Sequence, residues 1–168
     1  MKQNKYDDNV FFQKYSQMDR SVKGLEGAGE WKTLERLLPD FHDKHVLDLG
    51  CGFGWHCRYA AEHGAASVLG VDISAKMIAK ARSMGNEGII EYRCMPMDIL
   101  LPEASFDIVL SSLAFHYTPD FQAVCRNVSR WLKPEGAFIF SVEHPVFTAQ
   151  GTQDWHYDES GQIMHWPV

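Results

Sequence analysis

A glycine-rich turn behind a short apolar run is the first place in this sequence where chemistry could occur. The stretch HVLDLGCGFGWH, which begins at His45, contains Asp48 and then Gly50, Gly52 and Gly54. Glycine lets the main chain turn sharply and approach a ligand with no Cβ in the way. The spacing differs from the G-x-G-x-x-G of dinucleotide sites and from the phosphate loop. It predicts either a nucleotide-like ligand above the turn or a tight turn without one.

Two further acidic residues follow the next apolar runs. Asp72 ends the run SVLGVD, and Asp98 stands in MPMDI. A carboxylate in the position of Asp72 can accept hydrogen bonds from both ribose hydroxyls, although a carboxylate is also favoured before a helix by its dipole. Asp98 could accept from an adenine amino group. Met97, Ile99 and Ile73 could flank the ring, or they could be core residues.

Two histidines are candidates for a general base. His116 follows the fourth apolar run, FDIVLS, whose Ser111 would pass the reacting end of a ligand. His144 follows the fifth run, beside Glu143 and before Pro145. A histidine near neutral pH can take a proton from a substrate. The alternative for each is a structural role in packing or in a turn.

The elements that would position these residues alternate regularly. We expect strands at residues 45–49, 67–72, 89–93, 106–111 and 137–142. Helices are expected at 54–63, at 75–84 behind a Ser74 cap, and after a Thr118 cap with Pro119 in first position. Such alternation indicates right-handed βαβ units, an α/β fold with a parallel sheet sandwiched by helices. Ligands of these sheets lie beyond the carboxyl ends of the strands, which is where the residues above are found.

The sequence divides into three parts in this reading. Residues 1–44 would form an N-terminal helical cap, with helices near 8–18 and 30–38 separated by the glycine-rich loop at 21–29. Residues 45–142 would form the core. Residues 143–168 show no strand or helix period and are expected to be an irregular tail.

Taken together, the motifs resemble those of class I S-adenosylmethionine-dependent methyltransferases. The resemblance covers about residues 45–142 and implies a Rossmann-like sheet in the order 3-2-1-4-5-7-6. We expect the order 3-2-1-4-5 here, with the 7-6 hairpin missing and the sequence incomplete at its C-terminal end. Segments 20–31 and 141–146 further resemble a bacterial subgroup that acts on small molecules.

The resemblance implies S-adenosylmethionine as the cofactor, with its methionine, ribose and adenine parts held in turn. Residues of the N-terminal helices, including Tyr6, would close over it. The expected cofactor-binding set is Asp48, Gly50, Cys51, Gly52, Gly54, Asp72, Ile73, Met77, Met97, Asp98, Ile99, Ser111, Tyr15 and Arg20. The fourth strand is followed by Ser-Ser-Leu-Ala, not an Asn-Pro-Pro-Tyr-like sequence, which favours a small-molecule acceptor. Two alternatives are a cofactor-binding or interaction domain without turnover and, with weaker motif support, an NAD-dependent oxidoreductase.

Composition and charge limit the number of domains, the partners and the cellular compartment that we expect for this protein. The 168 residues fit one domain, and the net charge of −6 disfavours nucleic acid as a partner. No apolar run approaches the roughly 20 residues of a membrane helix. The four cysteines form no C-x-x-C pair, so we expect no metal site and a cytoplasmic location. Strand edges left open by missing strands would favour self-association, so an oligomer is possible.

Overall fold

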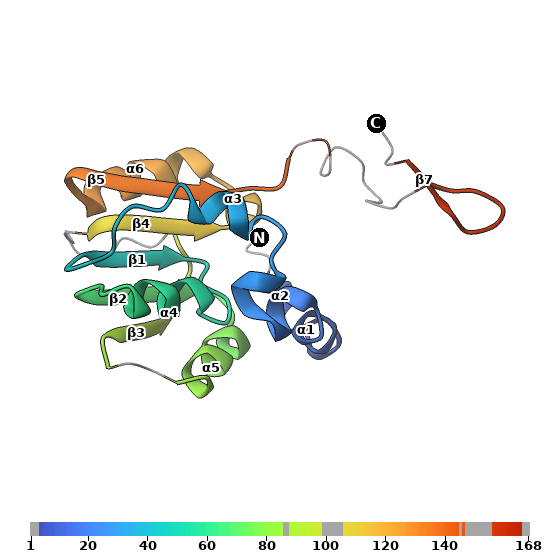
Figure 1. The fold of residues 1–168 in the computed structure, drawn as a ribbon, viewed down its shortest axis with the longest axis horizontal. Helices are drawn as coiled ribbons and strands as arrows, with labels where there is room; N and C mark the ends of the chain where they lie inside the picture. The colour runs from blue at the N-terminus through green and yellow to red at the C-terminus, as the bar shows by residue number, and fades with distance from the viewer. Residues whose placement is uncertain (1–3, 86–87, 99–105, 145, 147–155, 166–168) are drawn as a thin grey trace.

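A five-stranded parallel sheet forms the centre of the molecule (Figure 1). The computed structural model describes residues 4–85, 88–98, 106–144, 146 and 156–165. The strands are β1 (His45–Leu49), β2 (Ser67–Asp72), β3 (Ile90–Cys94), β4 (Phe106–Ser112) and β5 (Leu132–Ser141). Their order is β3-β2-β1-β4-β5, and each adjacent pair is parallel. The predicted α/β class and strand order are confirmed.

Helices cover both faces of this sheet. Residues of α4 (Trp55–Glu62) and α5 (Ala75–Ser83) join one buried cluster, and residues of α6 (Phe121–Trp131) join the other. Successive strand residues point to opposite faces, so Val46 packs in the first cluster and Leu47 in the second. Burial on both sides explains why the strands read as nearly continuous apolar runs.

The N-terminal segment is more broken than predicted. It contains η1 (Lys5–Asp7), α1 (Asn9–Ser16), α2 (Asp19–Val22), η2 (Gly24–Gly27) and α3 (Trp31–Glu35). The helix predicted near 8–18 is present as α1 and ends at Ser16, and the extended Met18, with ψ of 150°, separates it from α2. Part of the predicted glycine-rich loop is the short 3-10 helix η2. Figure 1 places α1 and α2 beyond the carboxyl ends of the strands.

The start of α6 corrects another prediction. Thr118 does not cap this helix, and Pro119 is not its first residue. Thr118 is extended and follows η3 (Phe115–Tyr117), whereas Asp120 is the cap. The Asp120 side chain accepts a hydrogen bond from the backbone N–H of Ala123 at 2.8 Å, which satisfies a free donor of the first turn.

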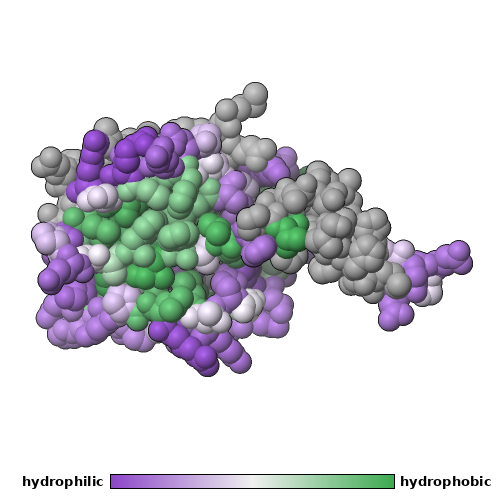
Figure 2. Space-filling view, turned by 90° about the horizontal axis from the view of Figure 1, so that it is seen from above, coloured by the Kyte–Doolittle hydropathy of each residue, from purple (hydrophilic) through white to green (hydrophobic). Residues whose placement is uncertain are grey.

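Strand β5 also begins earlier than predicted. Leu132 already pairs with Phe106, the register then shifts, and Ala137 pairs with Ile108. Among the described residues no strand pairs with the outer edge of β5. Figure 2 looks onto this side and shows hydrophobic residues gathered there. Phe121, Phe140 and Val142 are 44%, 42% and 45% exposed.

The tail contains a hairpin that the sequence does not predict. Strands β6 (His156–Tyr157) and β7 (Ile163–His165) form a separate antiparallel sheet. The Asp158 carboxylate closes the turn by accepting from the backbone N–H groups of Ser160 and Gln162, both at 2.9 Å. Figure 1 shows the hairpin apart from the five-stranded sheet. No helix in the described ranges is long and apolar enough to cross a bilayer.

Candidate active site

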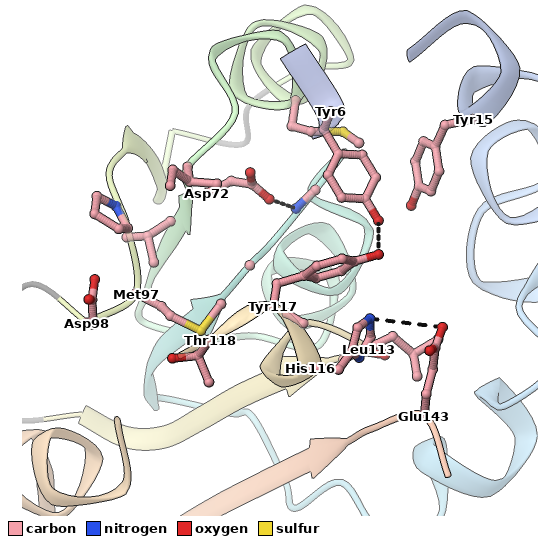
Figure 3. A pocket seen from close by; sticks show the side chains of 18 of the residues that line it. Tyr6, Tyr15, Asp72, Met97, Asp98, Leu113, His116, Tyr117, Thr118 and Glu143 are labelled. Atoms are coloured by element: carbon pink, nitrogen blue, oxygen red, sulfur yellow. Dashed lines mark hydrogen bonds and ion pairs between the residues drawn. The ribbon is translucent and has the colours of Figure 1, made fainter. Parts of the chain in front are cut away.

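A cavity of about 390 Å³ lies at the carboxyl ends of β1, β2 and β4. Strand-end residues such as Gly50, Asp72 and Ser112 form one part of its wall, and Tyr6 and Arg20 of the N-terminal segment form another. Figure 3 shows side chains from these distant segments pointing into the same space. The position agrees with the rule that ligands of parallel sheets bind beyond the strand ends.

Gly50 and Gly52 of the glycine turn line the cavity, whereas Gly54, also predicted to bind the cofactor, is buried outside the cavity wall. Gly50, Gly52 and Gly54 all adopt left-handed conformations, with φ of 75°, 54° and 75°. A Cβ added to Gly50 would lie 2.5 Å from Cβ of Ala114, and one added to Gly54 would lie 2.2 Å from Oη of Tyr92. Gly50 and Gly54 are therefore required for packing. A Cβ on Gly52 would meet no protein atom within 4 Å, so the main chain there borders open space.

Asp72 connects two elements of the cavity wall. Its carboxylate accepts hydrogen bonds from the backbone N–H of Gly52 at 2.9 Å and of Ser74 at 2.8 Å. Burial raises the pKa of Asp72, and these two hydrogen bonds oppose that shift. One carboxylate thus holds the glycine turn against the start of α5 while it lines the cavity.

Asp48 lies beneath the turn and outside the cavity wall. Its side chain is 1% exposed and accepts a hydrogen bond from Sγ of Cys57 at 3.3 Å. Burial raises the pKa of Asp48 to about 7, against the opposing effect of the Cys57 hydrogen bond. Of the residues predicted to bind the cofactor, Cys51 and Ser111 are also buried away from the wall. The Ser111 hydroxyl donates to the carbonyl of Leu49 at 2.8 Å and ties β4 to β1.

The segment after β3 supplies the far wall. Met97 and Asp98 line the cavity with Ile73 and Met77. All four belong to the predicted cofactor-binding set, and the sequence assigns Met97, Asp98 and Ile73 to an adenine. The side-chain amide of Asn127 on α6 donates to the carbonyl of Asp98 at 3.3 Å, which joins this segment to that helix. Ile99, assigned to the same pocket, lies outside the described residues.

The N-terminal segment closes the top of the cavity with aromatic rings. Oη of Tyr6 lies 3.1 Å from Oη of Tyr117, and the ring of Tyr6 meets that of Tyr15 edge-on at 5.2 Å. Burial raises the pKa of Tyr6 and of Tyr15, so both stay neutral phenols at neutral pH. Asp7 fastens this segment by accepting from the hydroxyl of Ser74 at 2.6 Å.

A histidine and a glutamate face each other at the other end of the cavity. Nε2 of His116 lies 4.0 Å from Oε1 of Glu143. Burial lowers the pKa of His116, and the charge of Glu143 opposes this shift, so the imidazole is neutral at pH 7. Its Nδ1 is buried without a hydrogen-bond partner among the described residues. Nε2 is therefore the ring nitrogen that can exchange a proton with a bound molecule.

The second predicted histidine occupies a different place. His144 is exposed, does not line the cavity, and accepts from the backbone N–H of Val146 at 3.2 Å. The sequence sets Glu143 beside His144, whereas the structure sets it against His116. Leu113 also lines the cavity, and no sequence pattern predicts its left-handed backbone, with φ of 50°. The described residues contain no cluster of three or more His, Cys, Asp or Glu side chains that could hold a metal.

Comparison with known proteins gives a consistent set of matches. Residues 47–140 match the methyltransferase domain family. A Listeria monocytogenes protein, solved as a candidate S-adenosylmethionine-dependent methyltransferase, is 53% identical with a TM-score of 0.76, covering 83% of this chain and 66% of its own. An S-adenosylmethionine-dependent methyltransferase of Mesorhizobium loti is 46% identical with a TM-score of 0.75, covering 86% of this chain and 66% of its own.

A further relative has a more specific name. The ubiquinone biosynthesis O-methyltransferase of Coxiella burnetii is 38% identical over 135 residues, which is 73% of this chain and 57% of the relative. This chain therefore spans about two thirds of the two solved structures and less of the O-methyltransferase. The matched region contains the glycine turn, Asp72 and Asp98.

Proposed function

The chain belongs to the class I S-adenosylmethionine-dependent methyltransferases, and from that premise we propose that it methylates a small-molecule acceptor from S-adenosylmethionine. The observation that carries the proposal is the Asp72 carboxylate. It faces the cavity while it holds the backbone of Gly52 beside it. That arrangement sets a carboxylate, which would bind the ribose hydroxyls, next to main chain that borders open space.

The cavity wall suits the parts of this cofactor. Asp72 would hold the ribose hydroxyls, and Met97 and Asp98 would hold the adenine. The methionine part would lie over Gly52, where the structure leaves open space. Arg20 would bind the carboxylate, because it is the only lysine or arginine among the described residues that line the cavity. When bound, S-adenosylmethionine supplies a methyl group activated by its sulfonium.

The protein's own contribution to the chemistry is positioning and proton removal. Holding two reactants in line can lower a barrier by roughly 7–11 kcal/mol. His116, neutral because burial lowers its pKa, would take the acceptor's proton on Nε2. The carboxylate of Glu143 would then stabilise the imidazolium that forms. General-base catalysis of this kind contributes about 10²–10⁴-fold.

We favour an oxygen nucleophile on the acceptor. A hydroxyl arrives protonated and needs a base, which the His116–Glu143 pair offers. The similarity to an O-methyltransferase supports the same choice. The aromatic rings of Tyr6 and Tyr117 beside the pair would suit a largely apolar acceptor.

We also place the protein in the cytoplasm, since its four cysteines are free.

A thermal-shift comparison tests the cofactor assignment. S-adenosylhomocysteine at about 100 times its Kd should stabilise the protein by roughly 2.7 kcal/mol, whereas NAD should leave the melting temperature unchanged. A response to NAD but not to S-adenosylhomocysteine would replace the proposal with an oxidoreductase. Mass spectrometry of a metabolite extract incubated with labelled S-adenosylmethionine then separates turnover from binding alone. Binding without any labelled product would favour the non-catalytic alternative.

A further inference from the structure

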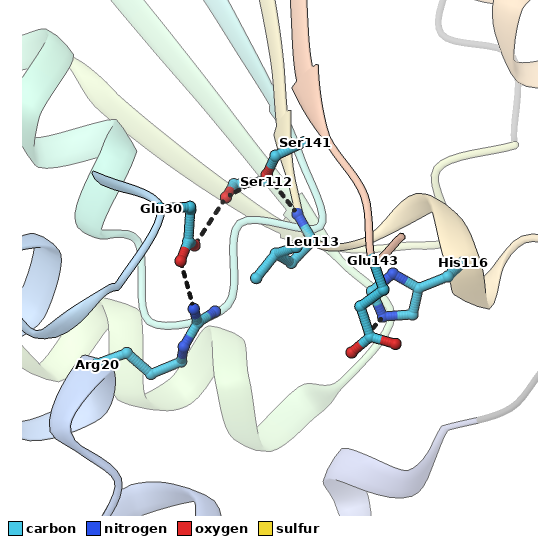
Figure 4. A network of polar contacts seen from close by, with 7 residues as sticks. All are labelled: Arg20, Glu30, Ser112, Leu113, His116, Ser141 and Glu143. Atoms are coloured by element: carbon cyan, nitrogen blue, oxygen red, sulfur yellow. Dashed lines mark hydrogen bonds and ion pairs between the residues drawn. The ribbon is translucent and has the colours of Figure 1, made fainter. Parts of the chain in front are cut away.

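Glu30 joins the N-terminal segment to the strand tips at the edge of the cavity. Its Oε2 accepts from Nη2 of Arg20 at 2.7 Å, and its Oε1 accepts from the hydroxyl of Ser112 at 3.5 Å (Figure 4). The side chains of Arg20 and Glu30 are 30% and 24% exposed, so the pair is partly shielded from water. Arg20 and Ser112 line the cavity, whereas Glu30 stands behind them.

The same network reaches a strained backbone position. The hydroxyls of Ser112 and Ser141 lie 3.0 Å apart. The backbone N–H of Leu113 donates to the carbonyl of Ser141 at 2.9 Å and lies 3.2 Å from its hydroxyl. Leu113 has φ of 50°, a conformation that non-glycine residues rarely adopt and that its surroundings must enforce. Glu30 therefore sits at one end of a series of contacts that ends at Leu113.

We propose that Glu30 is a positioning residue for the carboxylate of the methyl donor. An arginine has five N–H donors in a rigid fork. Glu30 accepts from Nη2 of Arg20 and holds the guanidinium group at the cavity. The other N–H donors of Arg20 are then left for a ligand carboxylate. Through Ser112 it also sets the tip of β4 on which that part of the donor would rest. The inference rests on the proposed function, because it presumes the donor in this cavity.

The role predicts a selective effect on ligands. S-adenosylhomocysteine has the amino-acid end that Arg20 would hold, whereas 5′-methylthioadenosine keeps the adenine and ribose without it. Glu30→Gln keeps the side-chain shape and an acceptor for Ser112 but removes the charge that orients Arg20. We expect it to weaken S-adenosylhomocysteine binding about tenfold, as for a lost charge-assisted hydrogen bond. Binding of 5′-methylthioadenosine should stay within about twofold.

Isothermal titration of both ligands to the full chain tests this expectation. Glu26→Gln is the matched control, since Glu26 lies in the same N-terminal segment and outside the cavity wall. Equal weakening of both ligands would show a general structural role and overturn the proposal, and so would unchanged binding of both. If wild-type protein binds neither ligand, both the proposed function and this inference are contradicted. If wild type binds both ligands and Glu30→Gln does not discriminate between them, the inference alone fails.

Discussion

The two ends of the cavity are built in different ways. The proposed donor end is formed by Gly52, which follows β1, and Asp72, which ends the adjacent strand β2. The Asp72 carboxylate accepts from the backbone N–H groups of Gly52 and of Ser74 behind it. The proposed acceptor end brings together Tyr6 and Tyr117, whose hydroxyls meet although 111 positions separate them in the sequence. Its groups come from the N-terminus, from η3 and from the segment after β5.

This difference explains which part of the function the sequence could identify. Gly52 and Asp72 of the proposed donor end are fixed by the parallel sheet itself, because adjacent strand ends must lie side by side. Arg20 is the exception, since it reaches the cavity from the N-terminal segment. The acceptor end depends on how separate segments fold over the sheet. It can change without disturbing the core, so one scaffold can serve many acceptors.

The largest expected effect is at the acceptor end. His116→Ala should lower turnover by about 10²–10⁴-fold while S-adenosylhomocysteine binding stays within about twofold, because the base acts on the acceptor. Labelled methyl transfer and calorimetry would measure the two quantities. His144→Ala is the control that distinguishes the two histidines. Only a small effect on turnover is expected, since His144 lies outside the cavity wall. A large loss in His144→Ala and none in His116→Ala would reverse the assignment.

The matching change at the donor end is Asp72→Ala. It should weaken S-adenosylhomocysteine binding about 10²-fold, because two hydrogen bonds to a charged group are lost. The hydrogen bond from the backbone N–H of Gly52 to the Asp72 carboxylate is lost as well. Asp72→Asn, which keeps one acceptor oxygen, should fall between Asp72→Ala and wild type. Affinity that is unchanged in both variants would remove the ribose assignment.

The buried carboxyl of Asp48, beneath the glycine turn, should make the stability of the protein depend on pH. Burial raises its pKa from 3.8 to about 7, so the folded state holds a proton that the unfolded state releases between those values. The free energy of unfolding therefore contains a contribution that decreases as the pH rises from about 4 to about 7. Asp48→Asn should flatten this dependence and be the more stable form at pH 8. Urea unfolding at pH 5 to 8 measures it, and parallel curves for both proteins would contradict the expectation.

A pH profile can test the pairing of Glu143 with His116. The base works in its neutral form, so activity is present above the pKa of His116 and lost as the pH falls through it. Burial lowers this pKa and the Glu143 charge raises it. Glu143→Gln should therefore move the acidic limb of kcat to lower pH, by less than about one unit. A shift to higher pH would show that Glu143 does not act through this charge.

The smallest effect concerns the contact between the N-terminal segment and the acceptor end. Tyr6→Phe removes one partner of the hydroxyl pair with Tyr117. The expected loss is about 0.5–1.5 kcal/mol of unfolding free energy, the usual net value of one hydrogen bond. Tyr117→Phe and the double variant complete a cycle. Fully additive losses would show that the two hydroxyls do not interact.

Individual residues show how far sequence reasoning reaches. The strand runs follow from apolar patterning, whereas their order was implied by the resemblance to a known family. Ser74 is confirmed as a cap because its side chain accepts from the backbone N–H of Met77. The prediction for Thr118 is wrong because Asp120 competes for the same role two residues later. The motif places Asp48 in the site, yet burial beneath the turn removes it from the cavity wall.

The sequence by itself determined the parallel sheet, the glycine turn and the acidic residues at the strand ends, because these depend on short-range patterns and on strand adjacency. Only the tertiary structure decided that Glu143 faces His116 rather than His144, and that Glu30 joins Arg20 to Ser112. Such contacts join segments that are far apart in the sequence. Their geometry is set by packing of the whole molecule, which no local pattern records.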